Sequence, residues 1–319
     1  MKPLGPKKPG EVNSHGASLG RHPMLIVNCL LVGLVVIVSV GSFILFPLLF
    51  APSLVSAIAL VVLTALITPL HWGLVHETVH SKLLCNEAWN RRAGRLLSIL
   101  LCLSWEMVRF GHLWHHRANR HDLDRPEAIE PGRSRLGHGA SYFFGLLGGS
   151  SLRGSLCPLG IMLPMRGTQR ALDFMFGASE SDETRAAAAR VFLDPAKRFV
   201  LRLDSVATTA LLALAFHNWG VRWQLPAIFL AVRWCVLSLL ENAPHYGTPR
   251  NSGAYARNTS LPWWARYLIL NQNFHGLHHR APYLPWHELH AAFVRSGLVA
   301  DGSWVSAVLH QFRGPIVLQ

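Results

Sequence analysis

The fold is decided by two apolar runs near the start of the chain. The first, at residues 24–50, reads MLIVNCLLVGLVVIVSVGSFILFPLLF and contains no charged side chain. The second, LVSAIALVVLTALITPLHW at 54–72, follows a short uncharged turn at 47–53. About 20 apolar residues suffice for a helix to cross a ~30 Å hydrocarbon core. The runs predict a transmembrane hairpin; a signal peptide fits less well, because the first run is too long and another follows at once.

A second hairpin is expected from the apolar segments at 206–219 and 223–240. Arg233 lies inside its second span, where a charged side chain is costly and faces a partner or a wet cavity, and Asp204 is one candidate partner. Three other segments are expected to be helical outside the spans. They are a buried or interfacial helix at 96–104, a re-entrant or interfacial segment at 137–165, and an amphipathic surface helix at 182–193.

The composition excludes several classes of protein. Half of the residues are hydrophobic and 15% are charged, against about 25% charged in soluble domains. These values exclude a disordered chain, a fibrous repeat and a small disulfide scaffold. The net charge of +13 suits anionic lipid or an acidic protein partner. Nucleic acid is not expected as a partner, because the sequence has no finger spacing and no basic heptad helix.

The expected architecture is an all-α integral membrane protein with two transmembrane hairpins and a cytoplasmic helical cap. Residues 1–22 are expected to form a disordered basic tail, 23–74 the first hairpin and 199–242 the second. The cap is expected to comprise 75–198 and 243–319. Lys and Arg flank the first hairpin, whereas its turn has neither. The positive-inside rule then places both termini in the cytoplasm.

Histidines are concentrated in three clusters that follow the apolar spans. The sequences are HETVH at 76–80, HLWHH at 112–116 and HGLHH at 275–279. On a helix, positions i, i+3 and i+4 share one face, so the imidazoles of each cluster can reach one metal. His245 stands alone, four residues after Glu241 and so on the same expected helical face, and is a further candidate ligand. The predicted metal ligands are His76, His80, His112, His115, His116, His245, His275, His278 and His279.

This number of imidazoles indicates two metal ions. A zinc hydrolase uses about three or four protein ligands, whereas neutral imidazole also suits iron and copper. Two redox-capable ions with four or five ligands each would use the whole set, and iron with open positions for O₂ is the natural choice. A membrane metal transporter would need polar residues in a row across the spans. A bis-histidine haem protein would need facing histidine pairs within the spans, and neither pattern is present.

The clusters and their surroundings resemble the histidine boxes of the integral-membrane fatty acid desaturase family, which includes hydroxylases and ketolases. HHRANRHDLDRP resembles the family's HHxxTN…D-P stretch, with Ala118 where Thr is usual. HHRAPYLPWHEL resembles its HHxxPxxPW segment, and ENAPHYG at 241–247 resembles its extra-histidine motif. Glu241 departs from the Asn common at this position in stearoyl-type members, which makes it a candidate catalytic or iron-binding residue.

The resemblance implies an O₂-dependent, non-haem di-iron oxidoreductase that acts on a long fatty acyl chain, as a free acid, thioester, carrier-protein adduct or lipid. Desaturation is the family's commonest outcome. Hydroxylation, ketolation, acetylenation and oxidative decarboxylation to a terminal alkene would use the same ligands. No HPGG segment of the cytochrome b5 type is present. A separate acidic carrier, such as a ferredoxin, rubredoxin or cytochrome b5 with its reductase, is therefore expected to supply the electrons. The expected location of the protein is a bacterial inner membrane.

Overall fold

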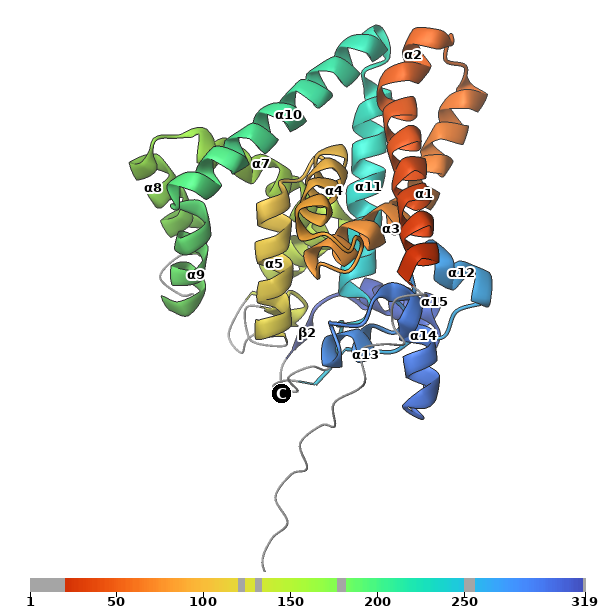
Figure 1. Ribbon diagram of the computed structural model, residues 1–319. Coiled ribbons are helices and arrows are strands. Elements are labelled where there is room, and N and C mark those ends of the chain that lie inside the picture. Colours follow the sequence, from red (N-terminus) through yellow and green to blue (C-terminus); the bar gives the residue numbers. More distant parts are fainter. Residues whose placement is uncertain (1–20, 120–123, 130–133, 177–181, 250–255, 318–319) are drawn as a thin grey trace, which may run out of the picture.

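The computed structural model describes residues 21–119, 124–129, 134–176, 182–249 and 256–317. Within this part of the chain, four helical segments are long and apolar enough to cross a membrane: Met24–Leu49, Leu54–Val79, Pro195–Arg222 and Gln224–Asn242. Figure 1 shows the first, second and fourth side by side and the third slanting away from them, with most of the remaining elements toward one end. The predicted all-α membrane fold is confirmed. Most of the predicted basic tail, at 1–20, lies outside the described residues.

The first hairpin begins with α1 (Arg21–Val40), which continues through a π-helical turn (Gly41–Leu45) into α2 (Phe46–Leu49). The prediction that the turn starts at Pro47 is wrong, because the helix continues to Leu49. Pro47 is tolerated because it lies in the first turn of α2, where a missing N–H costs little. Proline and the π turn leave carbonyls free. Those of Phe43 and Ile44 accept hydrogen bonds from Trp219 and Asn218 of the second hairpin.

The second helix of this hairpin, α3 (Leu54–Val79), runs well beyond Trp72 and carries the first histidine cluster in its last turn. Its start is marked by Ser53, whose hydroxyl accepts from the Ser56 N–H in a reciprocal capping box. The span therefore delivers His76 directly, with no intervening loop.

Two helices follow α3 at the end of the bundle that carries the first histidine cluster. They are α4 (Glu87–Leu100) and α5 (Trp105–Ala118), which meet at an angle of 102°. The prediction of a separate helix at 96–104 is wrong, because this stretch comprises the last turn of α4 and the buried link that follows it. Close packing sets the crossing: a Cβ on Gly94 would lie 2.7 Å from both Thr78 Oγ1 of α3 and the Trp105 ring of α5.

A broken helix covers one side of α11. It comprises α6 (Arg135–Phe144), a π turn (Gly145–Gly149) and α7 (Ser150–Met162). Gly148 has φ +106, and a Cβ there would lie 3.0 Å from the Cys235 backbone nitrogen of α11. Glycine is required here for its backbone conformation and for this close approach. The segment predicted to be re-entrant or interfacial is thus a broken helix, and it is not among the candidate spans.

The next two helices, α8 (Met165–Phe176) and α9 (Asp182–Phe192), form a side lobe with the start of α10 (Figure 1). The helix predicted at 182–193 is present. Its amphipathic character is visible in the burial of Ala188 and Phe192, which pack with Ile161 and Leu201.

The second hairpin consists of α10 (Pro195–Trp219), a short 3₁₀ turn (Gly220–Arg222) and α11 (Gln224–Asn242). Arg233 is fully buried and donates to the Leu100 carbonyl at 2.7 Å and to Ser39 Oγ at 3.0 Å. Asp204 is not its partner, because Asp204 binds Arg95 at 2.9 Å. The suggested pairing was wrong: α4 lies between the two residues and presents Arg95 to Asp204 and its free C-terminal carbonyl to Arg233.

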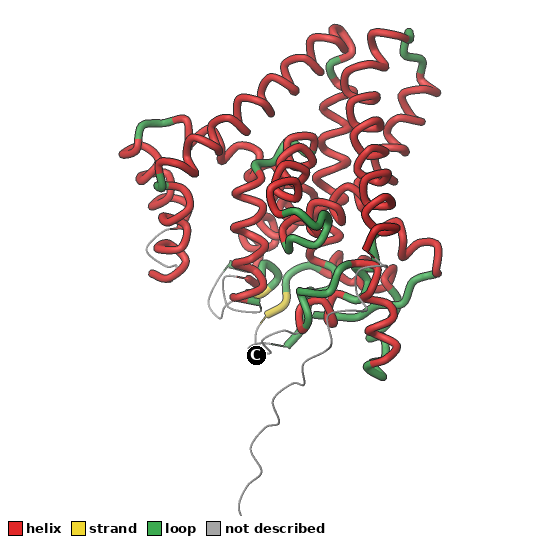
Figure 2. Tube along the Cα trace, in the orientation of Figure 1, coloured by secondary structure: helices red, strands yellow, loops and turns green. Residues whose placement is uncertain are grey.

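The C-terminal part completes the cap with short helices. They are α12 (Trp263–Leu268), α13 (His275–Arg280), α14 (Trp286–Arg295), α15 (Trp304–His310) and a 3₁₀ turn (Gln311–Arg313). Figure 2 shows one small exception to the helical fold, a parallel pair formed by β1 (Ala128–Ile129) and β2 (Ile316–Val317). This pair ties the chain end to the segment after α5. The exact domain boundaries expected from the sequence remain predictions.

Candidate metal centre

Four parts of the fold bring the histidines together at the end of the bundle that carries the cap. His76 and His80 come from the end of α3, and the second cluster lies along the last two turns of α5. The third cluster forms the short helix α13, and His245 lies in the turn after α11. The expectation that His245 shares a helical face with Glu241 is wrong, because α11 ends at Asn242. All nine predicted ligands fall within the described residues.

The nine imidazoles separate into two groups whose ring nitrogens could each hold one metal ion. In each group the candidate ligand atoms lie within 4.8 Å of one another. We call them the five-histidine group (His76, His80, His112, His116, His278) and the four-histidine group (His115, His245, His275, His279). Each group mixes residues from several elements, and both α5 and α13 contribute to both groups. The HxxHH spacing therefore supplies ligands to two sites, not three ligands to one.

The ring nitrogens of each group face one another at short range. In the five-histidine group, His112 Nε2 lies 3.0 Å from Nε2 of both His80 and His116. In the four-histidine group, His115 Nε2 lies 3.1 Å from Nε2 of His245 and 3.3 Å from Nε2 of His279. The Nε2 atoms thus converge, and the Nδ1 atoms are left for other partners.

Burial favours the neutral form of the buried imidazoles, which is the form that binds metals. Burial is the main cause that lowers the pKa of His80, to about 4. Burial and then the neighbouring imidazoles place the pKa of His275 and His278 well below the usual range. A neutral imidazole has one donor and one acceptor nitrogen, so a proton on His112 Nε2 could serve only one of its two neighbours. His76 Nε2 is buried and has no hydrogen-bond partner among the described residues. The donor set therefore fits a cation at the centre of each group.

Polar side chains hold several imidazoles from behind through Nδ1. Asp124 lies 2.8 Å from His115 Nδ1, and Asn119 lies 3.3 Å from His279 Nδ1. The Gln272 amide contacts both groups: its Nε2 lies 3.0 Å from His76 Nδ1 and its Oε1 lies 3.3 Å from His275 Nδ1. The oxygens of Asp124 and Gln272 can accept from Nδ1 and so leave Nε2 of that imidazole free for a metal. The amide nitrogens of Asn119 and Gln272 that face His279 and His76 are donors.

Two features fix α13 against the rest of the centre. The buried Glu77 carboxylate accepts from the Trp286 backbone N–H at 3.0 Å and so joins the first cluster to the segment after the third. Gly276 allows α13 to lie on the chain before it, because a Cβ there would overlap the carbonyl oxygen of Ala256. The second residue of the HGLHH cluster is thus a glycine for reasons of packing.

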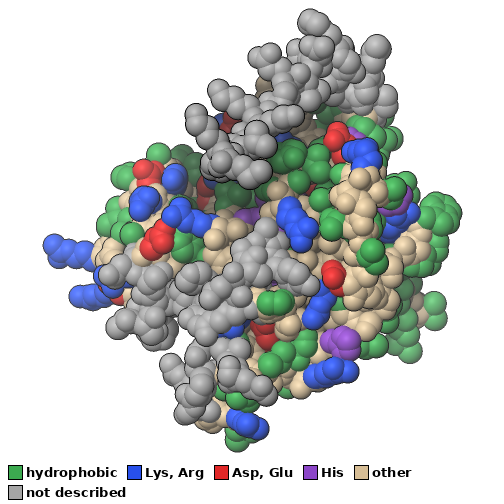
Figure 3. All heavy atoms as spheres, turned by 90° about the horizontal axis from the view of Figure 1, so that it is seen from below, with side chains coloured by type: hydrophobic (Ala, Val, Ile, Leu, Met, Phe, Trp, Pro, Cys, Tyr) green, Lys and Arg blue, Asp and Glu red, His purple; other side chains and the backbone are tan. Residues whose placement is uncertain are grey.

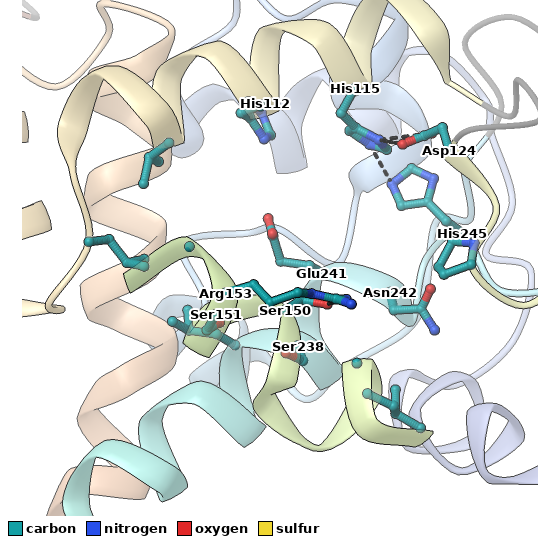
Figure 4. Close-up of a pocket in the computed structure, with 18 of the residues that line it drawn as sticks. His112, His115, Asp124, Ser150, Ser151, Arg153, Ser238, Glu241, Asn242 and His245 are labelled. Carbon is teal, nitrogen blue, oxygen red and sulfur yellow. Dashed lines mark hydrogen bonds and ion pairs between the residues drawn. The ribbon is translucent and has the colours of Figure 1, made fainter. Parts of the chain in front are cut away.

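A cavity of about 550 Å³ opens onto the histidines. Residues of both groups line it, among them His112 and His115, together with Trp72 of α3 and Glu241 of α11. Figure 4 shows Glu241 pointing up toward these two histidines. Its side chain is exposed to the cavity, and its carboxylate belongs to neither histidine group. The predicted role of Glu241 as an iron ligand remains a prediction.

The structure adds residues that were not selected from the sequence. Gln272 stands three residues before His275, the same helical spacing as within the clusters, so its position could have been noticed. Asn119 and Asp124 lie in the quoted HHRANRHDLDRP stretch. His121 and Asp122 of the same stretch lie outside the described residues. No pattern in the sequence pointed to Arg153 or Ser150, which also line the cavity.

Comparison with known proteins gives one result. The family described as Fatty acid desaturase matches residues 51–305, which is most of the chain and includes all three histidine clusters. No curated protein and no solved structure matches the chain significantly.

Proposed function

The chain belongs to the fatty acid desaturase family, and on this premise we propose that it is a di-iron membrane enzyme that uses O₂ to desaturate a fatty acyl chain. Membership makes it an oxidoreductase that spans the membrane several times. The choice of iron, the desaturation outcome and the acyl substrate are our proposals.

One observation carries this proposal: two groups of converging, mostly buried imidazoles open onto one cavity. The ligands would divide between the ions as five and four histidines. When bound, the two ions would supply O₂ activation and the oxidising power needed to remove hydrogen from an unactivated C–H bond. Desaturation converts CH₂–CH₂ into CH=CH while O₂ is reduced to two waters. O₂ takes up four electrons, of which the substrate supplies two and an external donor supplies two.

The protein's part in this reaction is to hold and enclose the chain. The cavity volume lies within the usual range of about 300–1,000 Å³ for small-molecule sites. Leu103, Met107 and Val108 form an apolar wall beside the histidines. An aliphatic segment against this wall would exclude water, and its C–H bonds nearest the histidines would react. Hydroxylation, ketolation, acetylenation and decarboxylation differ from desaturation in which bonds lie there, so products identify the outcome.

We also propose that a small acidic electron carrier docks on the cap. The net charge of +13 supports this, as does the distribution of Lys and Arg over the cap end shown in Figure 3. Arg280 follows His279 directly and is exposed. Complementary charge would steer an acidic partner to the side of the protein where the imidazoles lie.

The same reasoning supports a cytoplasmic position for the cap and both termini, in a bacterial inner membrane. The four spans form two hairpins, and α1 begins at the end of the bundle that carries the cap (Figure 1). At the opposite end, the sequence from 41 to 65 contains no Lys or Arg, and the second hairpin turn contains Arg222. The positive-inside rule then assigns the cap to the cytoplasm. Activity of a C-terminal reporter only outside the membrane would contradict this topology.

The test of the centre is the metal content of the purified protein. We expect about two iron ions per chain. His278→Ala and His115→Ala, one from each group, should lose iron and activity together while the protein still inserts. His217→Ala, at an exposed site outside both groups, is the matched control. Full activity in either group variant, or stoichiometric zinc without iron, would refute the assignment.

The outcome of the reaction is tested by mass spectrometry of the products. The iron-loaded protein is supplied with acyl substrates, O₂ and a reductase system. Desaturation predicts a product two hydrogens lighter than the substrate. A product heavier by one oxygen, or one carbon shorter with a terminal alkene, would overturn desaturation while the di-iron assignment stands.

A further inference from the structure

The cavity below the histidines contains two side chains of opposite charge, Glu241 of α11 and Arg153 of α7. Neither forms an ion pair with any described residue. In Figure 4, Glu241 points toward the histidines, whereas Arg153 crosses the lower part of the cavity beside Ser150. The Arg153 guanidinium lies in a mainly apolar cavity and is not paired with a carboxylate of the described residues. It is therefore free to bind the carboxylate of a ligand.

The surroundings of Arg153 leave room for such a ligand. Its nearest polar contact is a long one, from Nη2 to Ser150 Oγ at 3.4 Å, and its guanidinium carbon lies 5.7 Å from the Phe144 ring centroid. Gly145 of the π turn passes beneath: a Cβ there would lie 3.8 Å from Arg153 Nη2 and 3.2 Å from Ser150 Oγ. Ser151 lines the cavity next to Ser150. The guanidinium and these hydroxyls are therefore available as donors.

Apolar side chains make up much of the cavity that Arg153 shares with the histidines. They include Leu103, Met107, Val108, Leu146 and Leu237, all of which line the same cavity. A ligand that contacts both ends must be aliphatic along its length and anionic at one end. The Arg153 guanidinium in the lining therefore takes the anionic end of such a ligand, and its chain extends toward the metal centre.

We propose that Arg153, with Ser150, binds the terminal carboxylate of the substrate, and that the substrate is therefore a free fatty acid. This inference rests on the proposed function, since it takes the histidine end as the site of reaction. A thioester would present a neutral carbonyl to the guanidinium and would give up the charge-assisted bonds that a carboxylate forms. A carrier protein would remain outside a cavity of about 550 Å³ and could not use Arg153.

Binding to the full-length, iron-loaded protein in nanodiscs tests this proposal without turnover. The probes are dodecanoate, dodecanol, methyl dodecanoate and dodecyl phosphate, with dissociation constants from calorimetry. We expect the wild type to bind dodecanoate about tenfold more tightly than the alcohol or the ester, the size of one charge-assisted hydrogen bond at a partly exposed site. Arg153→Ala and the longer Arg153→Gln should each abolish this preference and leave the binding of dodecanol unchanged.

Arg170→Ala is the matched control, because Arg170 is exposed on α8 and does not line the cavity. It should retain the preference for dodecanoate. Equal wild-type affinity for dodecanoate and dodecanol, or an unchanged preference in both Arg153 variants, would overturn the proposal. Tighter binding of dodecyl phosphate than of dodecanoate would overturn the carboxylate assignment. A protein that shows the expected preference but carries no iron would overturn the proposed function and leave the anion site in place.

Discussion

Gln272 offers the sharpest test of how the two groups are held, because one side chain contacts both. Its amide lies 3.0 Å from Nδ1 of His76, in the five-histidine group, and 3.3 Å from Nδ1 of His275, in the four-histidine group. An imidazole that binds a metal through Nε2 carries its proton on Nδ1 and needs an acceptor there. Gln272 Oε1 can accept from His275, whereas Gln272 Nε2, which faces His76, is a donor. Gln272→Met keeps the length of the side chain and removes both contacts.

The magnitude follows from the number of contacts at each group. One hydrogen bond contributes about 1 kcal/mol net, which is about fivefold in an equilibrium constant. Only the Oε1 contact can support a metal-binding imidazole, and it serves His275 of the four-histidine group. Gln272→Met should therefore weaken the four-histidine site by about 5- to 10-fold, the lower end of what supporting contacts are worth in metal proteins. Gln272→Glu offers two acceptor oxygens in place of one, and should bind iron at least as tightly as the wild type.

Anaerobic titration with ferrous iron against a chelator measures the two sites, and Mössbauer spectra show whether both are affected. Asp124→Asn is the comparison, because Asp124 contacts His115 and should weaken the four-histidine site alone. Gln169→Met is the control, since Gln169 contacts Asp173 on α8, away from the histidines. A Gln272→Met protein that binds both ions with wild-type affinity, or in which only the five-histidine site is weaker, would refute this role of Gln272.

Three further predictions follow from the same structure. The Glu241→Gln protein should keep its iron, because Glu241 lies outside both groups, but its turnover should fall about 10- to 100-fold. Wild-type turnover in this variant would show that Glu241 takes no part in the reaction. Gly276→Ala should lose iron, since its Cβ would overlap the Ala256 carbonyl, whereas Gly33→Ala, with open space around it, should not; metal analysis of the two proteins compares them. Reduction by an acidic carrier should slow as salt rises, because the Debye length falls from about 10 Å at 0.1 M to 3 Å at 1 M, and equal rates at low and high salt would contradict charge steering.

The fold class and the ligands could be read from the sequence because both depend on local patterns. An uncharged run of membrane length has few alternatives to a spanning helix, since every backbone polar group must be satisfied in lipid. Histidines at i, i+3 and i+4 share a helical face wherever the helix lies. The candidate ligands and the first hairpin were accordingly found without coordinates, apart from Pro47, whose effect on the turn depended on bonds from Trp219 and Asn218.

The partners of each residue could not be read from the sequence, because they depend on which elements meet. Asp204 and Arg233 are suitable partners by type, but α4 lies between them and bonds to each. The HLWHH cluster looks like one site along the chain, yet α5 lies between the two groups and gives His115 to one and His112 and His116 to the other. The role of Gln272 depends on its contact with His76 of α3. The role proposed for Arg153 depends on the cavity that it lines. Helical periodicity places side chains on a face, and only the packing of helices decides what that face contacts.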